Sequence, residues 1–257
     1  MKKTPPYQFA GIIPARFASS RFPGKPLVMI GTKTMIQWVY DQASKILDTV
    51  FVATDDKRIF DAVLNFGGKA IMTSPDHLSG TDRCAEAVLK INEESGRKIE
   101  IVINIQGDEP FIKPEQIALL MNCFQDETVE LATMVRKVES GEDIFNPNQP
   151  KVLLNIKGDA IYFSRAAIPY VRDAEKEDWT KKQVFYKHIG LYAYKAETLS
   201  KITLLPCSSL ELSESLEQNR WIENGYRIRT AVTEWQSIGI DTPEDLEKAN
   251  LLLEHFF

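Results

Sequence analysis

The feature that most constrains the fold is a regular alternation of apolar runs with helical patterns over residues 7–125. Short runs rich in Val, Ile and other apolar residues predict strands at 7–14, 49–56, 69–74 and 99–110. Between them, apolar residues at helical spacing predict helices at 34–47, 58–68 and 80–94. The run "IEIVINIQGDEP" is apolar on both faces, as in a central strand of a parallel sheet. This order predicts an α/β fold in three layers with a doubly wound, mainly parallel sheet.

The pattern changes at Leu131, after which strands predominate. We expect strands at 131–138, 151–164 and 186–195, joined by loops, and hence a mixed or antiparallel arrangement. The chain then returns to a helix at 209–225, a strand at 226–234 and a final helix from 242, with either Asp241 or Thr242 as its N-cap. We predict one domain over 1–257, with a smaller lobe inserted at roughly 131–205.

Composition limits the functional class. The chain has a net charge of -5, with 44% hydrophobic and 26% charged residues, as expected for a globular protein. This mild acidity argues against nucleic acid or a membrane surface as a partner. No apolar run approaches the roughly 18 residues of a membrane span, and Met-Lys-Lys precedes no apolar signal core, so we expect a cytoplasmic protein. The three cysteines are far apart, which predicts reduced thiols and no structural zinc.

Several familiar motifs are missing from the sequence. Pro26 follows Lys25 where a P-loop needs Ser or Thr, and Ser19 stands where its first glycine belongs. No G-x-G-x-x-G fingerprint, H-E-x-x-H or G-x-S-x-G occurs at a suitable place. P-loop enzymes, most metalloproteases and α/β hydrolases are therefore excluded.

A basic loop follows the first predicted strand. The first 40 residues contain six Lys and Arg and no Asp or Glu, and "IIPARFASSRFPGKPL" holds Arg16, Arg21 and Lys25. In open parallel sheets the ligand crevice lies at the carboxyl ends of the strands, where these cations can meet phosphate oxygens. The alternative is a solvated surface without a ligand.

Two acidic motifs suit a magnesium ion held against phosphates. Asp108 in "QGDEP" follows the most apolar strand and therefore reaches the same edge of the sheet as the basic loop. Asp241 in "GIDTPEDL" is a second candidate ligand if the fold brings it beside Asp108. The alternatives are that Asp108 only starts a turn with Gly107 and that Asp241 only caps the last helix.

Two further motifs suit the recognition of hydroxyl groups. His188 and Tyr192 share one face of the predicted strand 186–195, although a buried histidine satisfied within the core fits the pattern equally well. Glu217, Gln218 and Arg220 lie within one helical turn, for which a solvated helix face is the alternative.

Taken together, these motifs resemble the 3-deoxy-manno-octulosonate (KDO) cytidylyltransferases, also called CMP-KDO synthetases, of lipopolysaccharide biosynthesis. The resemblance runs over nearly the whole chain in an ordered set that includes "IIPARFASSRFPGKPL", "VFVATDD", "SGTDR", "NIQGDEP", "YFSRAAIPY", "HIGLYAY", "SLEQNR" and "GIDTPEDL". It implies a three-layer nucleotidyltransferase fold, a homodimer, and a Mg²⁺-dependent reaction of CTP with KDO that gives CMP-KDO and diphosphate.

The resemblance also implies roles for single residues. Arg16 and Lys25 hold the triphosphate, Asp108 and Asp241 bind magnesium, and these four are the expected catalytic residues. The main chain of Pro14 and Ala15 holds the base, and Arg83 and Gln106 lie between nucleotide and sugar acid. The residues expected to face the sugar are His188, Tyr192, Glu217 and Gln218.

Two positions depart from the family's pattern. Phe22 replaces a frequent leucine, which is a conservative apolar exchange, and Asn219 replaces the leucine of "LEQLR". Asn219 leaves open an amino-substituted KDO or a contact that never touches substrate. Two further functions stay open as well: a cytidylyltransferase for sialic acids, which "HIGLYAY" and "SLEQNR" disfavour, and a sensor of CTP or sugar acid without catalysis.

Overall fold

A computed structural model describes residues 7–18, 22–96, 98–139, 141–236 and 238–256. The chain divides into two compact units, each considered by itself below. The first comprises 1–118, 193–203 and 237–257, and the second comprises 119–192 and 204–236. Helix α4 (Pro114–Cys123) and strand β10 (Tyr186–Lys195) run from one unit into the other. The second unit includes most of the range predicted for the lobe, whose role in dimerisation and sugar binding stays a prediction.

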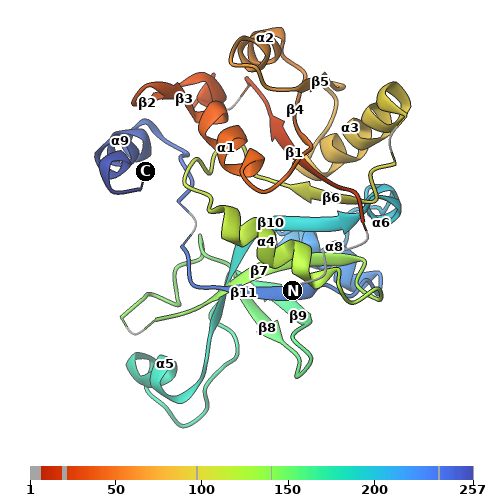
Figure 1. Ribbon diagram of the computed structural model, residues 1–257. Coiled ribbons are helices and arrows are strands. Elements are labelled where there is room, and N and C mark those ends of the chain that lie inside the picture. The colour runs from red at the N-terminus through yellow and green to blue at the C-terminus, as the bar shows by residue number, and fades with distance from the viewer. Residues whose placement is uncertain (1–6, 19–21, 97, 140, 237, 257) are drawn as a thin grey trace, which may run out of the picture. The chain divides into compact units, whose positions relative to one another are not determined.

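The first unit contains the predicted parallel sheet. Its strands are β1 (Phe9–Ala15), β4 (Val50–Thr54), β5 (Ala70–Met72) and β6 (Ile101–Asn104), in the order β6-β1-β4-β5. All three pairings along this path are parallel, and every residue of β6 is buried, as its sequence predicts. The doubly wound arrangement is visible in Figure 1.

The helices of this unit begin at residues that cap them. Thr34, Asp56 and Ser79 accept backbone N–H groups at the starts of α1 (Met35–Ser44), α2 (Lys57–Asn65) and α3 (Gly80–Ser95). At the start of α9 (Pro243–Phe256), the Thr242 hydroxyl accepts from the amide of Asp245, so Thr242 is the cap. The unit also contains the 3₁₀ turn η1 (Lys25–Leu27), the two short strands β2 (Met29–Ile30) and β3 (Lys33–Thr34), and α6 (Ala196–Ile202).

Helix α9 packs beside the short β2–β3 hairpin (Figure 1). The Asn250 carboxamide accepts the amide of Gly31 at 2.9 Å. An apolar cluster of Ile30, Met35, Phe111, Ile240 and Ala249 lies beneath this contact. The end of the chain is therefore anchored to the segment that follows the basic loop.

The second unit is mixed, as predicted. Strand β11 (Arg229–Thr233) pairs in parallel with β7 (Leu131–Lys137), while β8 (Lys151–Leu154) is antiparallel to both β10 and β9 (Ala160–Ser164). A single strand over 151–164 was the wrong prediction, since the chain turns back at Gly158, whose φ is 78°. The amide of Asn155 donates to the carbonyl of Asp159 across this turn.

The helix predicted at 209–225 is two helices, α7 (Ser209–Glu214) and α8 (Gln218–Glu223). Ser215 ends α7 with a φ of 50°, and the guanidinium of Arg165 donates to the carbonyls of Glu214 and Ser215. These bonds fix a break that helical periodicity alone does not reveal. A second small core consists of Val138, Ile144, Trp179 and Phe185, of which Trp179 begins α5 (Trp179–Lys182), directly after η2 (Lys176–Asp178).

Asn219, the departure from the family's pattern, is fully buried in the second unit. Its carboxamide oxygen accepts from the amide of Phe163 at 3.3 Å, and its nitrogen donates to the carbonyl of Phe163 at 2.9 Å. Both polar ends are thus used on the main chain of β9. Asn219 joins α8 to β9, which explains the residue without any contact to a ligand.

We expect Asn219→Ala to lower the free energy of unfolding by about 2–4 kcal/mol, because it leaves two buried backbone groups of Phe163 without partners. Urea denaturation followed by circular dichroism measures the change. Asn65→Ala, at an exposed position of α2, is the matched control and should stay within about 0.5 kcal/mol of the wild type. Equal stability of Asn219→Ala and the wild type would contradict this assignment.

Candidate functional site

The order of the strands creates an opening at the carboxyl edge of the first unit's sheet. Successive strands β1, β4 and β5 run to one side, whereas β6 lies on the other side of β1, so the direction reverses between β1 and β6. The ladder between these two strands ends at Ile12 and Asn104, while the ladder to β4 continues to Ala15. The main chain of Pro14 and Ala15 therefore remains paired only toward β4 in the sheet.

Glycine at position 107 lets the loop after β6 approach this opening closely. A Cβ atom at Gly107 would lie 3.0 Å from the carbonyl oxygen of Pro14. Gln106, Gly107 and Asp108 thus come directly against the end of β1, and Gln106 is only partly buried. This brings together the predicted base-binding segment and the "QGDEP" motif.

The basic loop folds back on an aromatic ring. The amide of Gly24 donates to the carbonyl of Phe17 at 2.9 Å, and Gly24 adopts a φ of 74° that favours glycine. The guanidinium of Arg58 lies 3.3 Å from the centroid of the Phe17 ring. These contacts fix the start of η1 and with it Lys25. Arg21 lies outside the described residues.

Lys25 joins the two predicted metal-binding carboxylates. Its ammonium group lies 2.6 Å from Asp108 Oδ2 and 3.0 Å from Asp241 Oδ1. Burial lowers the pKa of Lys25, but the two carboxylates outweigh this effect, and the net pKa is raised. The amide of Ile240 also donates to the carbonyl of Asp108 at 2.9 Å, which holds the two acidic segments together. The expectation that Asp241 lies beside Asp108 is therefore correct in geometry.

Arg83 lies beneath the same edge and is completely buried. Its Nη1 donates to Thr73 Oγ1 at 2.5 Å, and its Nη2 lies 3.5 Å from Asp55 Oδ2. Burial lowers the pKa of Arg83, Asp55 opposes this shift, and the neighbouring positive charge of Arg16 adds to it. Arg16 itself, partly exposed, forms no ion pair with any described residue. The positive charges of Arg16 and Arg83, held close together, favour the binding of an anion.

The paired carboxylates meet the requirements of a magnesium site. Both supply oxygen, which Mg²⁺ prefers, and both already lie within bonding distance of one cationic group, the ammonium of Lys25. Over the described residues, no group of three or more His, Cys, Asp and Glu could hold a metal ion. Two carboxylates suffice when substrate phosphates and water complete the coordination, so the residues present fit Mg²⁺.

In the second unit, His188 and Tyr192 lie on the same face of β10, as alternation predicts. The Thr133 hydroxyl lies 2.9 Å from the carbonyl of Leu191 and shares a hydrogen bond with His188 Nε2, 3.1 Å away. His188 Nδ1 has no hydrogen-bond partner among the described residues. Burial lowers the pKa of His188 to about 3, so its ring is neutral at pH 7.

Helix α8 is buried, so the interpretation of residues 217–220 as a solvated helix face is wrong. The guanidinium of Arg220 donates to Glu217 Oε1 at 2.9 Å and to the carbonyl of Leu205 at 3.1 Å. Gln218 is 4% exposed, and its Nε2 is a buried donor without a partner in the described part of the chain. Trp221 anchors the helix through an edge-on contact with the ring of Tyr192. Gln218 thus carries an unused donor next to the other predicted sugar-binding residues of this unit.

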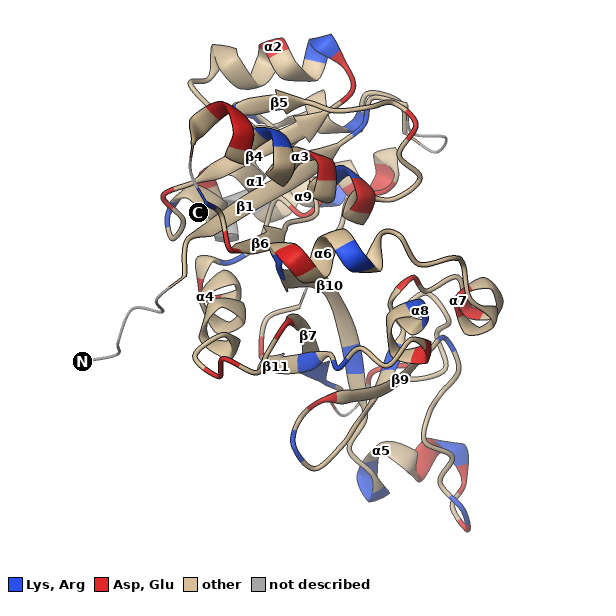
Figure 2. Ribbon diagram, turned by 90° about the vertical axis from the view of Figure 1, so that its right-hand side faces the viewer, with Lys and Arg blue, Asp and Glu red and all other residues tan. Residues whose placement is uncertain are grey.

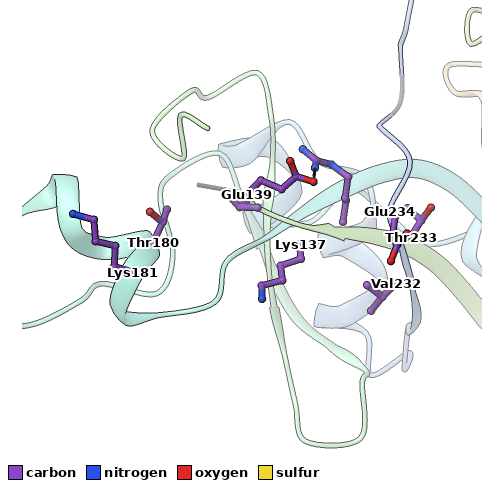
Figure 3. A pocket seen from close by; sticks show the side chains of 9 residues that line it. Lys137, Glu139, Thr180, Lys181, Val232, Thr233 and Glu234 are labelled. Carbon is purple, nitrogen blue, oxygen red and sulfur yellow. Dashed lines mark ion pairs between the residues drawn. The ribbon is translucent and has the colours of Figure 1, made fainter. Parts of the chain in front are cut away.

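The second unit also contains a pocket of about 660 Å³ that includes none of the predicted site residues (Figure 3). Its lining comes from the ends of β7 and β11 and from α5. Glu139 reaches toward the guanidinium of Arg136, 3.4 Å away, and Lys181 lies 2.6 Å from Asp178. Acidic and basic residues lie close together in the segment of η2 and α5 (Figure 2).

Sequence reasoning missed Asp55 and Thr73, the partners of Arg83, and Thr133, the partner of His188. Asp55 and Thr73 directly follow β4 and β5, so the rule that placed Arg16 and Asp108 at the carboxyl edge applies to them too. Thr133 lies inside a buried strand, where no sequence signal distinguishes it.

Comparison with known proteins extends these observations. A family model described as cytidylyltransferase matches residues 10–228. The fold and the site at the carboxyl edge of its sheet are therefore those of a cytidylyltransferase. A 3-deoxy-manno-octulosonate cytidylyltransferase of Parabacteroides distasonis is 56% identical over 246 residues, covering 94% of this chain and 96% of that protein. The protein of the same name from Bacteroides thetaiotaomicron is 55% identical over 251 residues, covering 96% and 99%. The chain belongs to the 3-deoxy-manno-octulosonate cytidylyltransferase family.

Solved structures agree. The structure of CMP:2-keto-3-deoxy-manno-octonic acid synthetase complexed with CTP superposes with a TM-score of 0.88 at 42% identity, covering 97% of this chain and 100% of that one. The predicted fold class is thereby confirmed. A 4-diphosphocytidyl-2C-methyl-D-erythritol synthase from Anaerococcus prevotii shares the fold at 14% identity, with a TM-score of 0.62. Among the described residues, no helix is both long and apolar enough to cross a bilayer.

The pKa of His188 generates a prediction about stability and pH. Since the unfolded histidine binds a proton near pH 6.5 and the folded one only near pH 3, the unfolded state binds more protons between these values. Stability is therefore lost as the pH falls. Between pH 7 and pH 5 the wild type should lose about 2 kcal/mol more than His188→Asn.

Urea denaturation of both proteins at several pH values measures this difference. Between pH 7 and pH 8 the two stability curves should run parallel, because His188 is neutral in both states there, and this range is the internal control. Parallel curves down to pH 5 would show that His188 titrates normally in the folded protein.

Proposed function

We propose that this protein transfers the cytidylyl group of CTP to KDO, forming CMP-KDO and diphosphate for lipopolysaccharide biosynthesis. The observation that carries the proposal is the meeting of Lys25, Asp108 and Asp241 at the carboxyl edge of a sheet in a chain that is 56% identical to a KDO cytidylyltransferase. The residues of both expected chemistries, phosphate binding and metal binding, are present together. This favours an enzyme over a sensor that only binds CTP.

The residues of the first unit are suited to the nucleotide. Arg16 and Lys25 are assigned to the triphosphate, since Arg16 has a charge that no described carboxylate neutralises. The main chain of Pro14 and Ala15, unpaired toward β6 in the sheet, is assigned to the base. Fixed cations near the α-phosphorus stabilise the charge that develops as the anomeric hydroxyl of KDO attacks in line and diphosphate leaves.

Asp108 and Asp241 are assigned to Mg²⁺. When bound, the ion neutralises phosphate charge and orients the triphosphate. The chain's own contribution is to keep two carboxylates together on rigid backbone, through the hydrogen bond from Ile240 to Asp108 and the apolar cluster beneath it. The ammonium group of Lys25 pairs with both carboxylates.

The sugar acid is assigned to residues of the second unit, and the family resemblance assigns Arg83 and Gln106 of the first unit to substrate binding. The Nδ1 of His188 is suited to a hydrogen bond with a sugar hydroxyl, and the Nε2 of Gln218 can donate a hydrogen bond to a sugar oxygen. Glu217 and Tyr192 complete the set that the family resemblance implies. Because both polar groups of the Asn219 carboxamide form hydrogen bonds with the main chain of Phe163, nothing at that position favours an amino-substituted sugar.

From the family resemblance we also propose a homodimer that works in the cytoplasm. Light scattering coupled to size-exclusion chromatography measures the oligomeric state directly. A mass of about 58 kDa, twice the 29.2 kDa of the chain, is the expected result, and a mass of one chain would contradict it.

The direct test is diphosphate release from CTP and Mg²⁺ with KDO, amino-KDO or N-acetylneuraminate as acceptor. We expect release with KDO at a kcat/KM at least tenfold above the other two. A preference for N-acetylneuraminate would select the sialic-acid cytidylyltransferase instead. No release with any sugar acid would leave the sensor as the better explanation.

Asp108→Asn should fold normally and lose Mg²⁺-dependent turnover by at least about 100-fold, since the amide is a neutral and weaker ligand. Its thermal midpoint should stay close to that of the wild type, because Asp241 still pairs with Lys25. Asp41→Asn removes a carboxylate that pairs with Lys33 at 2.8 Å outside this cluster, and is the matched control with full activity. Normal turnover of Asp108→Asn would refute the metal assignment.

A further inference from the structure

Asp55 directly follows β4 at the carboxyl end of the strand, beside Arg83, and has no assigned role. Its Oδ2 lies 3.5 Å from Nη2 of Arg83, too long for a strong hydrogen bond. Its Oδ1 is buried and has no hydrogen-bond partner in the described part of the protein. The side chain is nevertheless 19% exposed, so it borders both the buried guanidinium and the open edge of the sheet.

Arg83 also has hydrogen-bonding groups without partners in the described part of the chain. Of its guanidinium nitrogens, Nη1 donates to Thr73, whereas Nε and Nη2 are buried without a hydrogen bond to any described residue. Such donors are costly to bury, and the positive charge of neighbouring Arg16 makes the position of Arg83 more unfavourable still. Asp55 is the nearest carboxylate that offsets this charge, and it does so through a loose contact.

The loose pair of Asp55 and Arg83 offsets the charge of Arg83 only in part. A well-formed bidentate pair would neutralise Arg83 permanently and remove its field from the sheet edge. With no carboxylate at all, the charge of buried Arg83 would add to that of Arg16, and polyphosphate, including diphosphate as a product, would be held too tightly for rapid release. The 3.5 Å separation lies between these limits.

We propose that Asp55 is a counter-ion that offsets the charge of buried Arg83 and thereby weakens the hold of Arg16 on polyphosphate, so that diphosphate can leave. The inference rests on the proposed function, since it takes the phosphates of CTP as the anion at Arg16. Asp55 acts through Arg83 and is a positioning residue. It makes no bond with substrate in this scheme.

The test uses Asp55→Asn, which keeps the shape and removes the charge. With inorganic triphosphate as probe, titration calorimetry should show a dissociation constant about five- to twenty-fold lower than in the wild type, because a repulsive charge is removed. In turnover with CTP, KM and kcat should both fall, since diphosphate leaves more slowly. Asp61→Asn, on exposed α2 where Asp61 pairs with Lys57, removes the same charge at a distance and should change neither quantity.

A purely structural role for Asp55 predicts the opposite result. Loss of a structural partner would displace Arg83, and triphosphate would bind equally or more weakly, which would overturn the inference. Should Asp55→Asn fold poorly, the double variant Asp55→Asn with Arg83→Gln decides, because removing both charges should restore stability if Asp55 is the counter-ion. A double variant no more stable than Asp55→Asn would likewise overturn it.

The two proposals fail independently. Wild-type diphosphate release together with unchanged triphosphate affinity in Asp55→Asn would refute the counter-ion and keep the enzyme. Tighter triphosphate binding by the variant without turnover in either protein would support the counter-ion and refute the proposed reaction.

Discussion

The site of the first unit depends on the ion pairs of Lys25 with Asp108 and Asp241. The three residues come from distant parts of the sequence, with separations of 83 and 216 residues from Lys25. Two acidic loops at one sheet edge would repel each other without a cation between them. Lys25 supplies that cation in a partly buried setting, while the hydrogen bond from Ile240 to Asp108 and the surrounding apolar cluster fix the backbone. The cluster thus sets one ammonium group against two carboxylates.

Most of the first unit is predictable from sequence because its signals are local. Runs of β-branched residues give the strands, and Thr34, Asp56 and Ser79 mark the helix starts with capping side chains. The rule for parallel sheets then sends Arg16 and Asp108 to one edge. Whether Asp241 joins them is a matter of tertiary contact, and only the packing of Ile240 and α9 against the segment after the basic loop decides it.

The second unit is less predictable because buried polar contacts define it. The break between α7 and α8 depends on Arg165, and the burial of α8 depends on bonds from Arg220 and Asn219 to groups distant in the sequence. Periodicity cannot distinguish such a helix from one that faces water, since its residues are polar in either case. The same limit applies to Thr133, whose hydroxyl forms the hydrogen bond to His188.

Lys25 bridges the two carboxylates in the structure, and we propose that it gives them up to Mg²⁺ when substrate binds. A crystal structure with CTP and Mn²⁺ in place of Mg²⁺ tests this most directly, because anomalous scattering locates the manganese. We predict a peak bound by both Asp108 and Asp241, with the Lys25 ammonium moved onto a phosphate oxygen. A metal peak away from these carboxylates, with Lys25 still between them, would contradict this role for Lys25.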